Sequence, residues 1–307
     1  MPKPKRANPN ERYHIRAVER ALFLLKTFLG NEPELSAGEI SKRIELDPST
    51  TFRMLVTLEA HGLLRQDPAT GKYRLGVTCL ELGSQFLKIN DVRKSAVDVM
   101  QGLRDEFGET VHLGVLDGDE IVYLEKLPGL HAIGLMSSRV GGRAPAHSTA
   151  IGKVLLAHLP ESDRRARFPR GRLVRRTPAT ITDWPAFQAE CARIQENQYG
   201  IDNEENEPGV KCVAVPIFSH KGVSAALSIS GPAARMDEHM NQHALIDHLK
   251  KATTQVSTEI GWGRGVDQIG VLTAPAAPSR AARRNHGHSP SPALRARRTS
   301  AQVSPKP

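Results

Sequence analysis

SAGEISKRIELDPSTTFRMLVTLEAHGLLRQDPATGKYRL, residues 36–75, predicts two short helices, a tight turn between them and a β-hairpin directly after the second helix. Ser36 begins a Ser-x-x-Glu capping box for the first helix. Asp47 and Pro48 give the second helix an N-cap and a first-turn proline, and Gly62 is placed to end it in the left-handed conformation. This layout is typical of a winged helix-turn-helix, which sets its second helix in the major groove of DNA.

The predicted second helix has apolar and polar side chains at helical spacing. Phe52, Leu55, Val56 and Leu58 are expected to form its buried face. The hydroxyls and the arginine left outside suit contacts with phosphates and base edges, and the strands around the loop at 67–71 would form a basic wing. The predicted DNA-contacting residues are Ser49, Thr50, Thr51, Arg53 and Thr57 on the helix and Arg65, Lys72 and Arg74 on the wing.

An alternative for this region is a small helical domain whose hairpin binds protein or has no partner. An ordinary solvent-exposed helix carries more Glu and Lys than this one does, which favours DNA. Residues 15–29, ahead of it, predict a further helix that packs under the other two. Its apolar residues at helical spacing are Val18, Leu22, Leu25 and Phe28 or Leu29.

The formal net charge of +9 on 307 residues is unevenly distributed. Residues 264–307 contain eight Lys or Arg and one acidic residue, residues 1–76 contain thirteen and nine, and the remainder contains 21 and 23. The last segment is rich in Pro, Ala, Ser and Arg and lacks apolar periodicity, which predicts disorder. Two roles stay open for it: a solvated appendage, or a salt-dependent aid to DNA association through phosphate contacts.

The length suits two domains with separate cores, and no stretch approaches the roughly 18 uncharged apolar residues of a membrane span. The start, MPKPKRANPNER, lacks the apolar segment of a secretory signal. Cys79, Cys191 and Cys212 are odd in number and widely spaced, which argues against a disulfide framework or a Cys-x-x-Cys metal site. We therefore expect a cytoplasmic protein without a cofactor, a metal or a membrane partner.

Beyond residue 76 the pattern is first helical and then changes to strands. Residues 77–90 predict an amphipathic linker helix, and Asp91 is placed to cap the next helix. The predicted strands are 110–116, 120–127 (joined to the first by an Asp-Gly turn), 133–137, 212–218 and 223–230. The predicted helices are 92–107, 148–158, 183–197 and a closing helix capped by Asp237 that ends near residue 260. This order predicts a mixed α/β domain of the α+β class.

Four segments in this region carry a resemblance to a known family: HLGVLDG (112–118), AHSTAIGK (146–153), GIDNEENEPGVKC (200–212) and LSISGP (227–232). With the helix-turn-helix and wing, and in this order, they resemble the IclR family of bacterial transcriptional regulators over residues 18–262. The resemblance implies a GAF-like, PAS-related effector domain, assembly into dimers and often tetramers, and small organic acids or aromatic compounds as ligands. Glu45 departs from the family pattern because Gly is common there, and so does Pro48, where Lys or Arg is frequent. A left-handed Glu45 would cost about 1 kcal/mol, and Pro48 removes one phosphate contact.

The same resemblance places the ligand where the helix after the His-x-(Ser/Thr) loop meets the strand with the cysteine. Ser148 and Thr149 would leave free amides and a positive dipole end at the start of that helix, which suits a carboxylate. Apolar residues would bury the carbon skeleton of the ligand, while Asp202 and Cys212 offer polar contacts. The predicted effector-binding residues are Ile133, Met136, Ala144, Ser148, Thr149, Ala150, Ile151, Asp202, Val210 and Cys212.

Structural roles compete with these assignments. His147 is more often a residue that fixes a loop than a metal ligand, and Cys212 is as often a small core residue. The acidic run 202–207 is ordinarily a solvated loop, and the arginines of 164–176 are expected at the surface or against a partner subunit. Thiol redox chemistry needs a resolving thiol beside a thiolate, and nothing in the sequence brings Cys191 close to Cys212. No Ser-His-Asp order, phosphate-binding Gly loop or metal-ligand cluster favours an enzyme.

The sequence thus predicts a homo-oligomeric, ligand-responsive regulator of transcription, a repressor rather than an activator. A dimer or dimer of dimers would bind a pseudo-palindromic operator in double-stranded DNA, and the ligand would change how the dimers pair. The alternative is a constitutive DNA-organising or protein-docking module whose C-terminal domain only oligomerises. The predicted segments are a basic tail (1–14), the DNA-binding domain (15–76), a linker helix (77–90), the effector-binding domain (91–262) and a basic tail (263–307).

Overall fold

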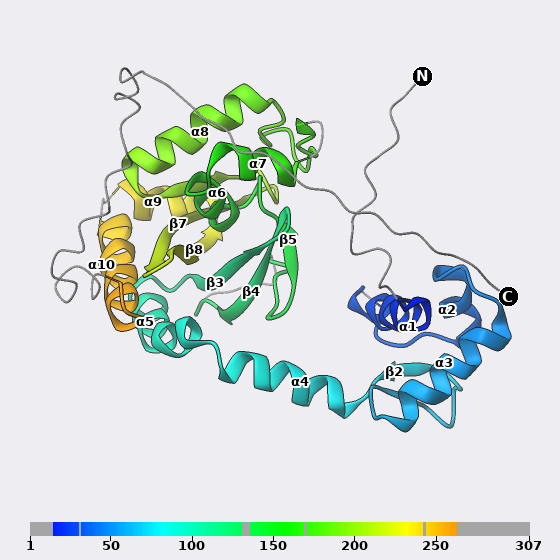
Figure 1. Cartoon of the computed structure of the whole chain (residues 1–307). Helices are drawn as coiled ribbons and strands as arrows, with labels where there is room; N and C mark the ends of the chain where they lie inside the picture. The colour runs from blue at the N-terminus through cyan, green and yellow to red at the C-terminus, as the bar shows by residue number, and fades with distance from the viewer. Residues whose placement is uncertain (1–14, 31, 131–135, 169–170, 242–243, 263–307) are drawn as a thin grey trace, which may run out of the picture. The chain divides into compact units, whose positions relative to one another are not determined.

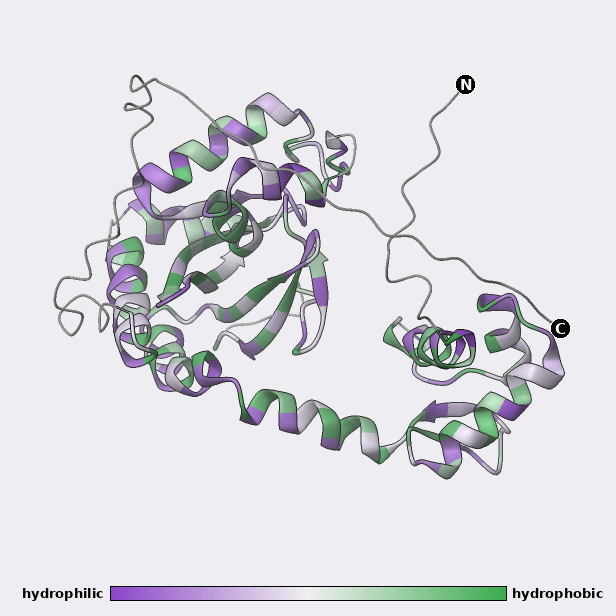
Figure 2. Cartoon of the chain, in the orientation of Figure 1, coloured by the Kyte–Doolittle hydropathy of each residue, from purple (hydrophilic) through white to green (hydrophobic). Residues whose placement is uncertain are grey.

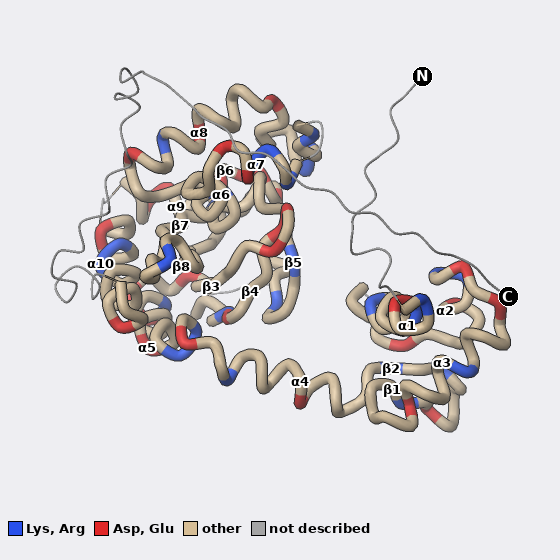
Figure 3. The backbone as a smooth tube through the Cα atoms, viewed as in Figure 1, with Lys and Arg blue, Asp and Glu red and all other residues tan. Residues whose placement is uncertain are grey.

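The computed structural model describes residues 15–30, 32–130, 136–168, 171–241 and 244–262. The two predicted tails lie outside these residues, so their boundaries stay predictions. Among the described helices, none is long and apolar enough to cross a membrane. Charged residues of both signs are interspersed over all the described parts (Figure 3).

The N-terminal part is the predicted winged helix-turn-helix (Figure 1). Its elements are α1 (Arg16–Lys26), the short 3-10 helix η2 (Thr27–Leu29), α2 (Ala37–Arg43), α3 (Pro48–Ala60), β1 (Leu64–Gln66) and β2 (Tyr73–Leu75). The two strands pair antiparallel, with Arg65 opposite Arg74. Leu35 adds a bridge to Tyr73 on the other side of β2, so the segment before α2 also ties the wing to the helices.

The predicted helix ends are confirmed by their hydrogen bonds. The Ser36 N–H donates to a Glu39 carboxylate oxygen at 2.7 Å, and the Glu39 N–H donates to Ser36 Oγ at 3.3 Å, which completes the capping box. The Thr50 N–H donates to Asp47 Oδ1 at 2.8 Å at the start of α3. Gly62 has a φ of 68°, the left-handed conformation expected just after the helix.

The faces of α1 and α3 differ from the prediction. On α3 the buried face is Thr51, Leu55 and Leu58, whereas Phe52 and Val56 are exposed. Residues 51, 55 and 58 are spaced so that they share one face of a helix, as the larger apolar residues also are. Thr51 can be buried because its hydroxyl donates a hydrogen bond to Asp47 O at 3.0 Å. Thr51 is therefore buried and removed from the predicted DNA-contacting set.

The buried face of α1 is also rotated from the one predicted. Leu24 and Phe28 enter the core that Leu55 and Leu58 also form. Val18 and Leu22 are each 53% exposed and do not pack under α2 and α3. Because α1 is rich in apolar residues on more than one side, hydrophobic spacing alone does not select which stripe is covered.

Glu45, in the turn between α2 and α3, has a φ of 53°. We expect Glu45→Gly to raise the free energy of unfolding by about 0.5–1 kcal/mol, because the relief of left-handed strain exceeds the added entropy of the unfolded chain. Urea unfolding of the two proteins measures this. Glu204→Gly is the matched comparison: its φ is 58°, but its carboxylate also accepts the Gly209 N–H at 2.8 Å, so the gain should be smaller. A loss of stability in Glu45→Gly would contradict the strain.

Two helices follow the wing: α4 (Val77–Lys88), the predicted linker helix, and α5 (Asp91–Phe107). No residue of α4 is buried, although apolar residues recur along it (Figure 2). The cap of α5 is Asn90, whose Oδ1 accepts the Arg93 N–H at 2.9 Å. Asp91, predicted as the cap, is instead the first residue of the helix. The cap is the residue before it, because the side chain of Asn90 is the one that accepts the free N–H.

The C-terminal part contains a six-stranded antiparallel sheet with the order β5-β4-β3-β8-β7-β6. The strands are β3 (Thr110–Asp117), β4 (Glu120–Leu127), β5 (Arg143–Pro145), β6 (Gly200–Asn203), β7 (Val210–Ser219) and β8 (Gly222–Pro232). The β3–β4 hairpin has the predicted turn, with Asp117 opposite Glu120 and Gly118 at a φ of 69°. The strand predicted at 133–137 is wrong where it is described, since Met136 and Ser137 are not in a strand, and β5 and β6 were not predicted.

Helices cover both faces of this sheet, which confirms the mixed α/β class (Figure 1). They are α6 (Ala150–Ala157), α7 (Glu161–Arg167), α8 (Trp184–Asn197), α9 (Ala233–Asn241) and α10 (Ala244–Glu259). One core lies between the sheet and α5, α9 and α10, and the other between the sheet and α6 and α8. The helix predicted to begin at Asp237 is wrong at its start: Asp237 lies within α9. Helix α7 was not predicted.

Candidate functional site

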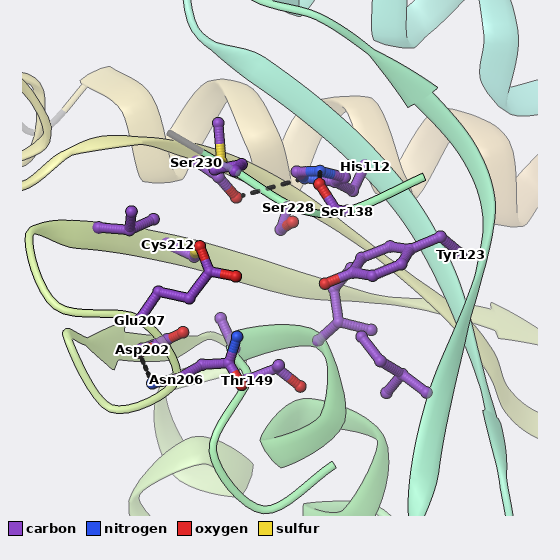
Figure 4. Close-up of a pocket in the computed structure, with 15 residues that line it drawn as sticks. His112, Tyr123, Ser138, Thr149, Asp202, Asn206, Glu207, Cys212, Ser228 and Ser230 are labelled. Carbon is purple, nitrogen blue, oxygen red and sulfur yellow. Dashed lines mark hydrogen bonds between the residues drawn. The ribbon is translucent and has the colours of Figure 1, made fainter. Parts of the chain in front are cut away.

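A polar pocket lies on the sheet face that α6 covers (Figure 4). The side chains of a strand alternate between its two faces. On β7, Val213, Val215 and Ile217 therefore enter the core under α10, while Cys212 points to the opposite side. The residues that line the pocket are His112, Ile121, Tyr123, Met136, Ser138, Thr149, Ala150, Ile151, Asp202, Asn206, Glu207, Val210, Cys212, Ser228 and Ser230.

The strand register brings distant polar residues together at the base of the pocket. Asp202 on β6 is opposite Cys212 on β7, and Cys212 is opposite Ser230 on β8. In the neighbouring row, Ser228 on β8 is opposite His112 on β3. Opposite residues in antiparallel strands have Cβ atoms about 5 Å apart, so these groups form one continuous polar surface.

His112 is buried, with a relative exposure of 3%. Its Nε2 lies 2.8 Å from Ser138 Oγ, and its Nδ1 lies 3.4 Å from Ser230 Oγ. Burial, assisted by the charge of Lys126, lowers the pKa of His112 to about 3. The imidazole is therefore neutral at pH 7 and supplies hydrogen bonds to the pocket but no positive charge.

Asp202 is 2% exposed and closes the other side of the pocket. Its Oδ1 accepts the backbone N–H of Glu205 at 2.7 Å and that of Asn206 at 3.3 Å. Burial raises the pKa of Asp202 to about 7, and these two N–H groups oppose the shift. A group with this pKa is partly protonated at neutral pH, so it both donates and accepts hydrogen bonds.

The pKa of Asp202 has a consequence for stability. The unfolded chain releases this proton above about pH 4, and the folded chain retains it to about pH 7, so the contribution of Asp202 to the free energy of unfolding falls as the pH rises between these values. We expect Asp202→Asn, which does not ionise, to gain stability relative to the unmodified chain from pH 4 to 7. Urea unfolding across that range measures the difference. A difference that stays constant with pH would contradict the raised pKa.

The first turn of α6 faces the same pocket. Thr149 is its N-cap: Oγ1 accepts the Gly152 N–H at 3.2 Å and donates to Pro145 O at 3.1 Å. The backbone N–H groups of Ala150 and Ile151 have no hydrogen-bond partner within the described ranges. Together with the helix dipole they form a site for an anion.

Two glycines let α6 approach the sheet and the preceding loop. A Cβ on Gly114 of β3 would lie 3.0 Å from Ile151 Cγ2. A Cβ on Gly152 would collide with the backbone of Ala146. The first turn of α6 is therefore held against the pocket by close backbone contacts that larger residues would prevent.

One turn beyond the free amides, Lys153 is 1% exposed and lies in an acidic cluster. Its Nζ donates to Glu205 and, at 3.1 Å, to Glu190. Glu190 also pairs with Arg193 at 2.8 Å. The acidic run at 202–207, expected in solvent, thus contains a buried member, Glu205, that connects the loop beside Asp202 to α6.

The structure brings most of the predicted effector residues together. Met136, Thr149, Ala150, Ile151, Asp202, Val210 and Cys212 line the pocket. Ala144 packs in the apolar core beside α6, and Ser148 is buried outside the lining, where its Oγ lies 3.3 Å from Asn206 Oδ1. Neither lines the pocket, and a ligand contact by either residue stays a prediction. Ile133 lies outside the described residues.

Several lining residues were not predicted, although five of them occur in the family motifs. The motif 112–118 contains His112, and the motif 227–232 contains Ser228 and Ser230. Because the side chains of a strand alternate between its faces, the two serines could have been placed on the same sheet face as Cys212. Asn206 and Glu207 lie in the third family motif, 200–212, whereas Tyr123 and Ser138 come from other elements and no local signal marks them. Burial raises the pKa of Tyr123, so its hydroxyl is neutral.

The alternative roles of the remaining residues are also resolved. His147 Nε2 lies 2.8 Å from Val174 O, the loop-fixing role. Arg164, expected at the surface, is 7% exposed and donates to Ala157 O at 2.8 Å beyond the end of α6. Burial, followed by the charge of Asp202, raises the pKa of Cys212 well above its usual value, and burial raises that of Cys191 to about 11. Both thiols are therefore protonated at neutral pH, which does not suit thiolate chemistry.

The predicted DNA-contacting residues lie on α3 and the wing. Ser49, Arg53 and Thr57 on α3 are exposed, Thr50 is half-buried, and Arg65, Lys72 and Arg74 on the wing are exposed. Arg74 is 3.7 Å from Glu34. No ion pair involves the Arg53 side chain within the described part of the chain, so its guanidinium is available to DNA.

Comparisons with known proteins agree with both parts. Residues 17–68 match the model of the IclR helix-turn-helix domain, and residues 84–258 match the model "Bacterial transcriptional regulator IclR C-terminal". The transcriptional regulator XynR of Escherichia coli is 43% identical over 73% of this chain and 89% of its own length. KdgR of Dickeya chrysanthemi, also a transcriptional regulator, is 37% identical over 78% of this chain and 79% of its own.

Solved structures are similar over the same region. The Thermotoga maritima IclR matches with a TM-score of 0.63 and 33% identity over 81% of this chain and all of that one. An IclR homolog from Microbacterium hydrocarbonoxydans, crystallised with 4-hydroxybenzoate, matches with a TM-score of 0.70 and 29% identity over 80% of this chain and 98% of that one. The helix-turn-helix domain binds DNA, and the C-terminal domain is of a type that binds small-molecule effectors. The chain belongs to the IclR family of bacterial transcriptional regulators.

Proposed function

We propose that the chain is a homo-oligomeric repressor that binds a pseudo-palindromic operator and responds to a small organic or aromatic acid. The observation that carries the proposal is the pocket, which contains the first turn of α6, with its two free backbone N–H groups, and a base of polar side chains. Repression is supported by a relative, the transcriptional repressor AllR of Salmonella typhi, which is 32% identical over 84% of this chain.

The pocket supports a ligand with one carboxylate. The N–H groups of Ala150 and Ile151 and the dipole of α6 favour an anion at that end. At the other end, His112 is neutral and Asp202 is partly protonated, so they suit a hydroxyl or carbonyl group better than a second charge. Ile121, beside them, provides an apolar contact for the carbon skeleton.

Exposed apolar surface supports assembly of the chain with itself. On α1 and at its N-cap, the following residues are each more than half exposed: Ile15, Val18, Leu22 and Phe23. On α4 the same is true of Val77, Leu80, Leu82 and Phe86. Contiguous apolar side chains of this size on a helix mark interfaces, and a two-fold dimer through either helix would present two copies of α3 to the two halves of an operator.

In the proposed mechanism the ligand changes the equilibrium between the DNA-bound and free assemblies. This requires that its affinity differ between the two states. Asp202 and the free amides of α6 belong to different elements, and Glu205 connects them through Lys153. A ligand bound between them would therefore alter the packing of α6 against the β6–β7 loop.

The effector part of the proposal is tested with a panel of small carboxylic and aromatic acids. An acid that binds should raise the melting temperature; at a hundredfold excess over its Kd the stabilisation is about 2.7 kcal/mol. The same acid should weaken binding to the operator, measured by fluorescence anisotropy. Asp202→Ala should reduce both effects, while Asp237→Ala, which removes a half-exposed carboxylate on α9, should reduce neither. An acid that stabilises the chain but leaves operator affinity unchanged would refute the switch.

The second candidate is a constitutive DNA-organising or protein-docking module. It predicts a dry or filled pocket in the C-terminal domain. The pocket is instead lined mainly by polar side chains, and its cavity of about 40 Å³ admits water. This volume is far below that of a ligand pocket, so a bound acid would have to widen it. If no acid of the panel changed either stability or DNA binding, the constitutive module would be preferred.

A further inference from the structure

Two large apolar side chains are exposed on α3, the helix that a winged helix-turn-helix places in the major groove. Phe52 is 57% exposed and Val56 is 46% exposed. Neither belongs to the core of the DNA-binding part, where α3 contributes Leu55, Leu58 and, in partial contact, Met54. Single exposed apolar residues are common on protein surfaces, but these two lie one helical turn apart on a functional helix.

The geometry of α3 puts them on its DNA-facing side. At 100° per residue, Ser49, Arg53 and Val56 fall within about 60° of one another, on the side opposite the buried Thr51, Leu55 and Leu58. Phe52 lies at one edge of that outward stripe, about 40° from Val56, and Arg53 lies at the other edge. The N-terminal half of a recognition helix is the half that contacts base edges. Phe52, the fifth of the 13 residues of α3, lies in that half, and Val56, the ninth, lies one turn beyond Phe52.

The chemistry of the major groove offers one apolar partner. Of the groups that base pairs present there, the 5-methyl of thymine is the one that apolar side chains contact, because it projects into the groove and neither donates nor accepts a hydrogen bond. Arginine, in contrast, pairs bidentately with O6 and N7 of guanine. A stripe of Phe52, Arg53 and Val56 therefore complements thymine methyl groups next to a guanine.

We propose that Phe52 and Val56 are specificity-determining residues that contact thymine 5-methyl groups in each operator half-site, beside a guanine bound by Arg53. The inference rests on the proposed operator binding and names the base chemistry that it uses. The available alternative for these side chains is a second copy of this chain, packed against α3. That alternative predicts a change in assembly and no dependence on thymine methyls.

The test begins with the full-length chain. High-affinity duplexes are selected from a random DNA pool, and each thymine of the selected half-site is then replaced in turn by deoxyuridine, which lacks only the methyl group. Kd is measured by fluorescence anisotropy at one fixed salt concentration, because phosphate contacts make affinity salt-dependent. Removal of a contacted methyl should weaken binding by about fourfold. In Phe52→Ala or Val56→Ala, loss of the same methyl should have no further effect.

Val174→Ala is the matched control. Val174, in the loop before α8, is 52% exposed, a fraction between those of Phe52 and Val56, and it lies on neither α3 nor the apolar faces of α1 and α4 that are proposed for assembly. This variant should keep the full sensitivity to deoxyuridine. Sedimentation of Phe52→Ala, at the concentrations used for binding, should show the unmodified oligomeric state.

Two results would overturn the inference: uracil duplexes that bind as tightly as thymine duplexes, or a Phe52→Ala chain that dissociates and still responds to the methyl groups. Failure of the proposed function has a different signature, since the selection would then enrich no sequence. Because both substituted side chains are exposed, the variants should unfold at the same urea concentration as the unmodified chain.

Discussion

Lys153→Met is expected to lower the free energy of unfolding by about 3–5 kcal/mol, the usual cost of removing one partner of a buried ion pair. Lys153 is 1% exposed, and its Nζ is the charge that faces Glu205. Burial already raises the pKa of Glu205, and its Oε2 has no hydrogen-bond partner within the described ranges. Without Lys153 the Glu205 carboxylate would be buried without its cationic partner. Urea unfolding of the two proteins measures the loss.

A second variant separates the charge from the packing. Lys153→Met with Glu205→Gln removes the unpaired charge and should recover a large part of the loss, since Glu190 keeps its partner Arg193. Lys94→Met is the matched control, because Lys94 forms an exposed pair with Asp91 at 3.4 Å. Exposed pairs contribute less than about 1 kcal/mol. Equal losses in Lys153→Met and Lys94→Met would refute the buried network.

Arg53→Ala is expected to weaken operator binding by about ten- to a hundredfold, the cost of one bidentate guanine contact. Arg53 is exposed on the outward stripe of α3 and has no ion-pair partner in the described part of the chain. Binding to random DNA should fall much less, because a base contact contributes little there. Titrations of operator and random duplexes at the same salt concentration measure both losses.

Two comparisons interpret that result. Arg65→Ala, on the exposed wing strand β1, should weaken both duplexes similarly if the wing contacts phosphates. Arg104→Ala, on α5, removes an arginine paired with Asp105 and should change neither. If Arg53→Ala also weakened both duplexes equally, Arg53 would be a phosphate contact and not a source of specificity.

The ends of elements were the most accurately predicted features. Ser36, Asp47 and Gly62 act on amides and carbonyls within a few residues of themselves, so the local sequence contains the whole interaction. The Asp117-Gly118 turn is of the same kind. The caps at Asp91 and Asp237 were wrong because an Asp within a helix has the same local sequence pattern as an Asp that caps one.

The choice of buried face was less accurate. On α3, Phe52 and Val56 are larger and more apolar than Thr51, yet Thr51 is buried. Burial at that position depends on Leu24 of α1 and Leu64 of β1, which complete the core from other parts of the chain. Hydrophobic spacing gives the period of a helix but not the identity of its neighbours.

The effector pocket shows the same difference between residues that a local motif marks and residues that only strand pairing brings together. Asp202 and Cys212 were found through a family motif, whereas Tyr123 and Ser138, which no local signal marks, were not. His112 and Ser230 stand in the motifs, but 118 residues separate them and only the pairing of β3 with β8 brings them together. Strand order and register set these contacts, and both depend on the packing of the whole sheet.

The sequence by itself determined the winged helix-turn-helix, the family and the α+β class, because caps, turns and hydrophobic periods are local and additive. Only the tertiary structure decided which side of α3 is exposed, which residues meet in the pocket and why Lys153 is buried among acids. Those properties depend on contacts between elements far apart in the chain. The role of a buried charge such as Lys153, or of an exposed apolar side chain such as Phe52, can be assigned only when the residues around it are known.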